Sequence, residues 1–262
     1  MRVWSGLLAM MLVAGCGTPA AVKGGGVVRL SARAPARVDP GALARSLTAV
    51  QPGWPHPDLT VDCREVKCVA LTFDDGPGRY TPWLLDELDD LEVKATFFVV
   101  GQMVAADRDH TLPRMVAAGH EIGNHSWSHA ELPGLSDEGI ARELGRTQDV
   151  VEQVAGVRMT VMRPPYGSTD ARVAAETRRL GLAQILWSVD TLDWRDRVPS
   201  VVARRAAKAT GGSIVLMHDI HRTTVEAVPN VVESLADKGY RFVTISELYG
   251  TTPAAGRKYT EL

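Results

Sequence analysis

Short apolar runs alternate with amphipathic stretches over most of the chain. Strand-type runs are predicted at residues 69–73, 95–100, 120–124, 159–162, 182–189, 213–217 and 242–245. Helical spacing of apolar positions is predicted at residues 83–91, 112–118, 136–155, 169–181, 199–210 and 224–238. Buried strands that alternate with helices are typical of a parallel sheet covered by helices. The pattern therefore predicts an α/β fold of about seven parallel strands, either an open sheet or a barrel.

Two of the helix starts carry capping signals. Ser136 stands directly before Asp137 and Glu138, which would form an acidic first turn, and Thr169-Asp170 precedes the next helix. Side chains of these types accept hydrogen bonds from the free backbone N–H groups of a first helical turn. We therefore expect N-caps at both places.

The first residues have the pattern of an export signal. Arg2 precedes an apolar run at residues 6–14, which is too short to span a membrane. The run closes on Val13-Ala14-Gly15-Cys16, which resembles a bacterial lipobox. The resemblance implies a lipoprotein signal peptide at residues 1–15 and a lipid on Cys16. The alternative is an ordinary secretory signal followed by a chance cysteine.

The following residues are typical of a tether. Residues 16–60 contain three consecutive glycines and scattered prolines without regular apolar spacing, as expected for a flexible linker. The folded domain is predicted at residues 61–250, with a C-terminal tail at residues 251–262. An exported protein with this anchor would face outward on the bacterial cell membrane.

Composition excludes several classes of protein. The 262 residues are 45% hydrophobic and 23% charged, which is ordinary for a globular chain and excludes a largely disordered or multi-span membrane protein. There are 29 Lys and Arg residues against 31 Asp and Glu, so no basic excess exists to bind a polyanion. We expect no nucleic-acid partner and a monomer.

The cysteines fit an exported chain. Cys63 and Cys68 lie five residues apart, just before the first predicted strand. Because disulfides persist outside the cytoplasm, we expect these two cysteines to form a local disulfide. Their spacing and the lack of further cysteines argue against a cysteine-based zinc site.

Carboxylates and histidines follow the first and third predicted strands. Asp74 and Asp75 end the first strand, and His125 and His129 follow the third at a spacing that places them on one face of a helical turn. Two imidazoles and one carboxylate would make a metal site with open positions, suited to hydrolytic zinc or non-haem iron. Seen separately, the aspartates also suit a turn and the histidines an exposed surface.

Further polar residues follow the later strands. Arg163 follows the fourth, Asp190 and Asp193 follow the fifth, and His218 ends the sixth. Each alone also fits a structural position, such as a surface turn, a helix cap or a hydrogen-bonded core histidine. The carboxyl ends of parallel strands, however, share one edge of the sheet. Together these groups favour a hydrolase site.

Five of these segments resemble the motifs of one family. They are Thr72-Phe73-Asp74-Asp75-Gly76-Pro77, His125-Ser126-Trp127-Ser128-His129, Arg163-Pro164-Pro165-Tyr166-Gly167, Asp190-Thr191-Leu192-Asp193-Trp194 and Leu216-Met217-His218. In this order they resemble the polysaccharide deacetylase family with the NodB homology domain, carbohydrate esterase family 4. The resemblance covers about residues 66–250 and implies a distorted (β/α) barrel and metal-dependent removal of acetyl groups.

The resemblance also implies a role for each matching residue. Asp75, His125 and His129 would bind a divalent metal ion, usually zinc, with cobalt as the alternative. Asp74 would be the general base, held in place by Arg163.

The remaining roles concern the acetyl group and the leaving amine. The backbone N–H of Tyr166 would stabilise the oxyanion, while Trp194 and Leu216 would line a pocket for the acetyl methyl. His218 would be the general acid, oriented by Asp193, although the sequence leaves Asp190 open for that contact.

We therefore expect a polysaccharide N-deacetylase whose substrate is a β-1,4-linked N-acetylglucosamine polymer, either peptidoglycan or chitin-like oligomers. Two alternatives stay open. One is an esterase that removes O-acetyl groups from xylan or another glycan with the same site. The other is a non-catalytic glycan-binding module at the cell surface, although such a module has no need of a paired base and acid.

Overall fold

The computed structural model describes residues 61–262, and all structural statements below concern this part of the chain. The expected signal peptide, Cys16 and the linker up to residue 60 lie outside the described residues. The predicted lipidation and tether therefore stay predictions.

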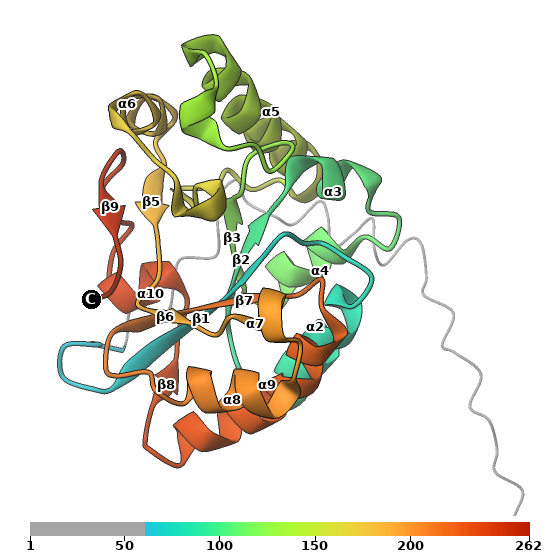
Figure 1. Ribbon diagram of the computed structural model, residues 1–262, viewed down its shortest axis with the longest axis vertical. Coiled ribbons are helices and arrows are strands. Elements are labelled where there is room, and N and C mark those ends of the chain that lie inside the picture. The colour runs from blue at the N-terminus through green and yellow to red at the C-terminus, as the bar shows by residue number, and fades with distance from the viewer. Residues whose placement is uncertain (1–60) are drawn as a thin grey trace, which may run out of the picture. The chain divides into compact units, whose positions relative to one another are not determined.

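A curled parallel sheet forms the centre of the domain (Figure 1). Its strands are β1 (Cys68–Asp74), β2 (Thr96–Val99), β3 (Glu121–Asn124), β4 (Val161–Met162), β5 (Ala183–Ile185), β6 (Val189–Asp190), β7 (Ser213–His218), β8 (Arg241–Phe242) and β9 (Lys258–Tyr259). The strand order is β6-β7-β1-β2-β3-β4-β5-β9, with β8 paired to β1. Every ladder between these strands is parallel. The predicted distorted barrel is confirmed in the form of a half-barrel.

One predicted strand is in fact two strands that lie far apart in the sheet. Residues 182–189 were expected to form a single strand, but β5 pairs with β4 and β9, whereas β6 pairs with β7. Residues 186–188 connect β5 to β6. This prediction is wrong because an apolar run indicates burial but not which neighbour a strand pairs with.

The C-terminal residues extend the sheet. Residues 251–262, expected only as a tail, include β9, which pairs with β5. Beyond β9, Glu261 makes an isolated antiparallel bridge to Ser213 at the start of β7. The end of the chain therefore contacts β5 and β7, which lie near opposite ends of the strand order. The run Arg257-Lys258-Tyr259-Thr260 is too polar to have been recognised as a strand.

Helices surround the sheet. They are α2 (Thr81–Asp90), α3 (Gly101–Ala106), α4 (Thr111–Ala117), α5 (Asp137–Ala155), α6 (Ala171–Leu180), α7 (Asp193–Asp196), α8 (Pro199–Ala206), α9 (Arg222–Ala236) and α10 (Ile245–Tyr249). Short 3-10 turns lie at Leu132–Gly134 and Pro165–Gly167. Figure 1 shows α2, α8 and α9 together on one side of the sheet. No helix of residues 61–262 is long and apolar enough to cross a membrane.

Both predicted N-caps are present, and a third cap, at Thr244, corrects one predicted strand. Ser136 Oγ accepts the Gly139 N–H at 3.2 Å, and Asp170 Oδ1 accepts two N–H groups of α6 at 2.9 Å. The strand predicted at residues 242–245 ends at Phe242, because Thr244 forms a capping box with Glu247 and starts α10 instead.

The alternation of β1 decides which residues reach the site. Val69, Leu71 and Phe73 belong to the core cluster that includes the surrounding helices. Cys68 and Ala70 belong to a second cluster on the opposite face. Since successive side chains of a strand point to opposite faces, Thr72 and Asp74 follow Cys68 and Ala70 on that second face. The face is apolar at its start and polar at the carboxyl end of β1.

The expected disulfide is confirmed. Cys63 and Cys68 are joined, with their Cα atoms 5.4 Å apart. Because Cys68 is fully buried as the first residue of β1, the bond fixes the segment that leads into the central strand.

Candidate active site

A cavity of about 380 Å³ lies at the carboxyl ends of the strands. It is lined by Asp74, Asp75, His125, His129, Pro164, Tyr166, Trp187, Asp190, Trp194, Leu216 and His218. Two of the predicted site residues, Arg163 and Asp193, do not line it but lie buried behind it. Segments far apart in the sequence thus meet where the parallel sheet was expected to place them.

Three side chains form a cluster that can hold a metal ion. One ligand atom from each of Asp75, His125 and His129 lies within 4.8 Å of the others. Asp75 Oδ1 is 3.5 Å from His125 Nε2 and 3.3 Å from His129 Nε2. This oxygen is buried without a hydrogen-bond partner in the described part of the chain. A buried, unpaired carboxylate oxygen facing two imidazole nitrogens fits a divalent cation such as zinc.

The electrostatics of the cluster favour its ligating form. Burial raises the pKa of Asp75, but the neighbouring His125, His218 and His129 outweigh it and bring the pKa down to about 2. Burial, followed by the charge of His125, lowers the pKa of His129. A metal ligand must be an ionised carboxylate or a neutral imidazole, and these are the forms that the shifts favour for Asp75 and His129.

The His125 ring is fixed by the backbone of the fourth motif. Its Nδ1 lies 2.7 Å from the carbonyl oxygen of Arg163. Since a carbonyl only accepts, Nδ1 carries a proton, and Nε2 is the ring nitrogen that faces Asp75 and could bind a metal ion.

Asp74 is held by a fully buried arginine. Arg163 Nη1 donates to Asp74 Oδ1 and to Thr72 Oγ1, both at 2.8 Å. Its Nε and Nη2 donate to the carbonyls of Ile185 and Leu186, both at 3.0 Å. The other oxygen of Asp74, Oδ2, lies 3.6 Å from His125 Nε2. The carboxylate is therefore fixed on one side and faces the metal cluster on the other.

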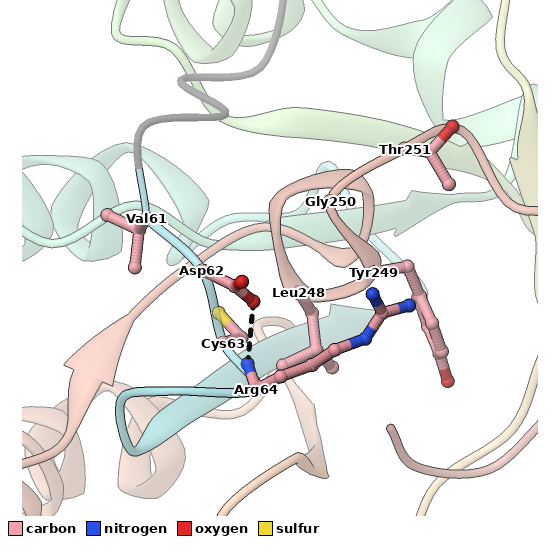
Figure 2. A pocket seen from close by; sticks show the side chains of 8 residues that line it. All are labelled: Val61, Asp62, Cys63, Arg64, Leu248, Tyr249, Gly250 and Thr251. Atoms are coloured by element: carbon pink, nitrogen blue, oxygen red, sulfur yellow. Dashed lines mark hydrogen bonds between the residues drawn. The ribbon is translucent and has the colours of Figure 1, made fainter.

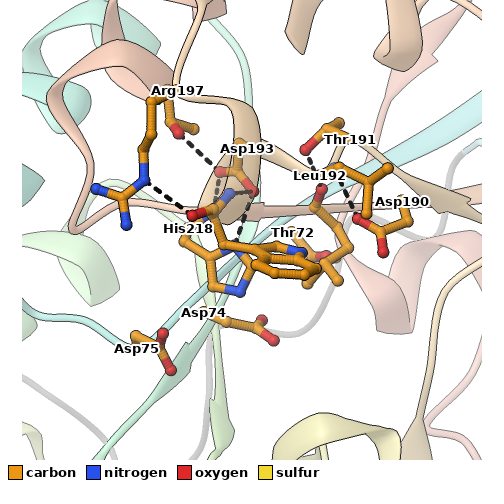
Figure 3. Close-up of polar contacts among 12 residues, drawn as sticks. Thr72, Asp74, Asp75, Asp190, Thr191, Leu192, Asp193, Arg197 and His218 are labelled. Atoms are coloured by element: carbon orange, nitrogen blue, oxygen red, sulfur yellow. Dashed lines mark hydrogen bonds and ion pairs between the residues drawn. The ribbon is translucent and has the colours of Figure 1, made fainter.

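His218 is paired with Asp193, not Asp190. The ring nitrogen Nδ1 of His218 lies 2.8 Å from Asp193 Oδ1. Asp193 Oδ2 accepts the backbone N–H of His218 at 2.7 Å. Asp190 accepts the Leu192 N–H instead, at 2.7 Å. Figure 3 shows Asp193 beside His218, whereas Asp190 lies farther away, at the right of the view next to Leu192. The structure thus decides between the two aspartates that the sequence left open.

This pairing favours the protonated imidazole. Burial lowers the pKa of His218, but Asp193, with the charges of Asp74 and Asp75, raises it to about 9. The same contact lowers the pKa of Asp193 against the opposing effect of its burial.

Several residues of the site have left-handed backbone. The φ values are 74° at Asp75, 63° at Ser126, 58° at His129, 60° at Tyr166 and 52° at Leu192. Such conformations cost free energy in non-glycine residues and are found where surrounding contacts hold them for a function.

Aromatic and apolar side chains also line the cavity. Leu216 is buried, whereas 47% of the surface of Trp194 and 69% of that of Tyr166 is exposed. The Tyr166 ring meets the His129 ring edge-on, with centroids 4.7 Å apart. These side chains give the cavity an apolar surface in addition to its metal cluster.

Sequence reasoning missed residues that support these groups. Thr72 binds Arg163, and Thr224 Oγ1 donates to Asp193 Oδ2 at 2.7 Å. A hydroxyl in an otherwise apolar strand was the one available signal for Thr72. Thr224 gave none, because its partner lies 31 residues away.

Asp219 is a further buried carboxyl group beside the site. Thr81 Oγ1 donates to it, and a Cβ added at Gly76 would overlap its carboxylate. Burial raises the pKa of Asp219 to about 7. The absence of a side chain at Gly76 is thus what lets the loop after Asp75 pack against Asp219, the residue that follows β7.

A second cavity of about 360 Å³ lies beside the disulfide (Figure 2). It is lined by Val61, Asp62, Cys63, Arg64, Leu248, Tyr249, Gly250 and Thr251. Asp62 Oδ1 accepts the backbone N–H of Arg64 at 3.0 Å, so the carboxylate stabilises the local turn. Its lining lacks the grouped histidines and carboxylates of the first cavity.

The fold and the site together define a class: a half-barrel with an Asp-His-His metal site at its carboxyl edge, flanked by an Asp–Arg and a His–Asp pair. The sequence profile described as polysaccharide deacetylase matches residues 62–185. The chain belongs to the polysaccharide deacetylase family, carbohydrate esterase family 4. The expected family is confirmed.

Two curated relatives show how far the similarity extends. The peptidoglycan-N-acetylglucosamine deacetylase PgdA of Listeria monocytogenes is 44% identical over 195 residues, which are 74% of this chain and 41% of that protein. A chitin deacetylase of Pestalotiopsis sp is 36% identical over 220 residues, 81% of this chain and 74% of that protein. The chain thus matches about two fifths of the length of PgdA.

Solved structures agree with the fold. The T48 deacetylase, solved with substrate, has a TM-score of 0.73 and is 46% identical. The match covers 76% of this chain and 100% of that chain. A family 4 acetyl xylan esterase from Clostridium thermocellum, in complex with a cobalt ion, has a TM-score of 0.68 and 34% identity, covering 75% of this chain and 99% of that one.

Proposed function

We propose that the protein is a metal-dependent hydrolase that removes N-acetyl groups from a polysaccharide of β-1,4-linked N-acetylglucosamine, either peptidoglycan or chitin-like oligomers. The observation that carries the proposal is one cavity that brings together the metal cluster, Asp74 held by Arg163, and His218 held by Asp193. The names of the relatives, peptidoglycan and chitin deacetylases, support the choice of substrate.

Amide hydrolysis needs an activated water, stabilisation of the oxyanion and a proton for a poor leaving group. A divalent metal ion held by Asp75, His125 and His129 would supply Lewis-acid polarisation and a more acidic water. Asp74 accepts the proton of the attacking water. Arg163 keeps that carboxylate oriented, because its guanidinium binds Asp74 and Thr72 together.

The later steps use the other side of the cavity. The backbone N–H of Tyr166 donates to the acetyl oxygen as charge develops on it. His218 then gives a proton to the leaving amine, which would otherwise depart as an unstable anion. Asp193 holds this imidazole in its protonated form. Trp194 and Leu216 enclose the acetyl methyl.

We propose zinc as the metal ion. Two histidines and a carboxylate with open positions are the donor set of many hydrolytic zinc sites. Cobalt is the alternative, and the cobalt ion in the related acetyl xylan esterase supports it.

The same relative favours a second candidate function, hydrolysis of O-acetyl esters on xylan or another glycan. The cluster, the base and the apolar surface of the cavity would serve it unchanged. An alkoxide leaves more readily than an amine anion, so a strong general acid matters less. The well-held His218 therefore favours the amide substrate.

Acetate release decides between the two functions. The protein is incubated with chitopentaose, purified glycan strands and acetylated xylan, before and after exhaustive chelation and re-addition of zinc or cobalt. We expect release from the N-acetylglucosamine substrates that disappears with chelation and returns with metal. Release from xylan alone would establish the esterase, and full activity without bound metal would refute both.

We also propose that Cys16 carries a lipid that anchors the domain to the bacterial cell membrane, facing outward, where peptidoglycan is the nearest acetylated polymer. The motif Val13-Ala14-Gly15-Cys16 supports this. Cys16→Ser should move the protein from the membrane fraction to the soluble fraction. If it stays membrane-bound, the anchor lies elsewhere.

A further inference from the structure

Both histidines of the metal cluster lie on one strained loop. Residues 125–129 connect the end of β3 to the segment before α5, and two of them, Ser126 and His129, have φ values of 63° and 58°. Left-handed backbone at non-glycine residues persists only where neighbouring groups hold it in place. The position of the His129 ring therefore depends on what binds this loop.

A single carboxylate binds the part of the loop that leads into His129. Glu143 Oε2 accepts the backbone N–H groups of Trp127 at 2.9 Å and of Ser128 at 2.8 Å. Glu143 Oε1 accepts the hydroxyl of Ser128 at 2.9 Å. Both oxygens are thus used on the two residues directly before the metal ligand, and hydrogen bonds to a charged acceptor are stronger than neutral ones.

The helix that carries Glu143 is itself joined to the loop at other points. Asn124 Nδ2 donates to the Leu144 carbonyl, and Asn124 Oδ1 accepts the Ser126 N–H, both at 2.9 Å. The guanidinium of Arg146 lies 3.8 Å from the centre of the Trp127 ring. The loop is therefore supported by α5. Of the α5 residues that contact it, Glu143 is the one that binds Ser128, the residue directly before His129.

We infer that Glu143 is a positioning residue for the metal site: its carboxylate holds the 127–128 backbone so that His129 Nε2 faces Asp75 Oδ1. The inference rests on the proposed function, since it assumes that the cluster binds a metal ion. Glu143 does not line the cavity, so its effect passes through His129. Removing its carboxylate should weaken the binding of metal before it changes the chemistry.

The test measures zinc affinity of the apo-protein by competition with a chromophoric chelator. Glu143→Ala should weaken affinity by on the order of 10- to 100-fold, the usual effect of losing a group that orients a metal ligand. The zinc affinity of Glu143→Gln should lie between those of the wild type and Glu143→Ala. The amide oxygen of Gln still accepts a backbone N–H, but its NH₂ cannot accept from the Ser128 hydroxyl. The matched control is Glu152→Ala on the same helix, which removes an exposed pair with Arg158 and should bind zinc like the wild type.

A role in folding alone is separated by two further measurements. Thermal unfolding of each apo-protein shows whether it is folded at the assay temperature, and Ser128→Ala, which removes one bond of the three, replaces Glu143→Ala if the latter does not fold. In folded variants, saturating zinc should restore kcat. Unchanged zinc affinity in folded Glu143→Ala, or a loss of kcat that zinc does not restore, would overturn the inference. If the wild type binds no zinc, the proposed function fails instead, and this inference with it.

Discussion

The two sides of the cavity are built differently. On the metal side, two of the three residues of the cluster, Asp75 and His129, are loop residues with left-handed backbone. The acid side begins with His218, the last residue of the regular strand β7, whose register pairs it directly with Asp74 of β1. The sheet thus places the base and the acid side by side, while the metal ligands depend on loops and on the side chains that hold them.

This difference teaches that metal binding and proton transfer can be disturbed separately. Changes in the loops should act on metal affinity, and changes at the ends of β1 and β7 should act on turnover with the metal still bound. Neighbouring residues in the sequence can therefore fall on different sides of the comparison.

The sharpest test uses adjacent aspartates. Asp75→Asn should lose most metal affinity and with it nearly all activity, because it removes the only charged ligand of the Asp-His-His cluster. Asp74→Asn should retain the metal and lose turnover by about 10²- to 10⁴-fold, the usual contribution of a general base. Bound metal is measured by elemental analysis alongside kcat. Equal loss of metal in both variants would show that the two roles are not divided in this way.

The acid side is tested next, by the choice of leaving group. His218→Ala should reduce hydrolysis of an N-acetyl substrate by about 10²- to 10⁴-fold. It should affect an activated acetyl ester much less, because that leaving group needs no proton. Rates on both substrates are compared at equal metal occupancy. A matching loss on the two would contradict the acid role.

A smaller effect is expected in the pH profile. His218 has its pKa raised from 6.5 to about 9. Amide hydrolysis should therefore fall as pH rises through about 9. Asp193→Asn removes the main raising influence, so the falling limb should move to lower pH. An unmoved limb would assign it to another group.

The sign for stability follows from the same shift. Because the pKa is higher in the folded protein, protonation of His218 favours folding; this stabilisation is complete below pH 6.5 and is lost as pH rises through about 9. The unfolding temperatures of the wild type and Asp193→Asn should differ most near pH 6.5 and become more similar as the pH rises to about 9.

The smallest effect is expected from a change away from both the metal side and the acid side of the cavity. Asp170→Ala removes the N-cap of α6, whose two hydrogen bonds are at 2.9 Å, and should lower the free energy of unfolding slightly, because two backbone N–H groups of the first turn lose their acceptor. Zinc affinity and kcat should stay at wild-type values. A change in either would mean that α6 is coupled to the cavity.

The sequence predicted best where local pattern and chemistry agree. β1 and β7 are apolar runs that end in charged residues, and their bounds match within a residue or two. The break between β5 and β6 was missed because both lie in one apolar run, and β9 because it is polar. Glu143 was missed because its partners lie 15 and 16 residues away, so its role exists only in the folded chain.

Arg163 has a consequence for the order in which the molecule forms. Its bonds to Ile185 and Leu186 reach 22 and 23 residues along the chain, but those to Asp74 and Thr72 reach 89 and 91. Closing such long loops is slow compared with forming helices. During refolding, helical signal should therefore return before activity, and the recovery of catalysis should report the joining of β1 to the segments around β4 and β5.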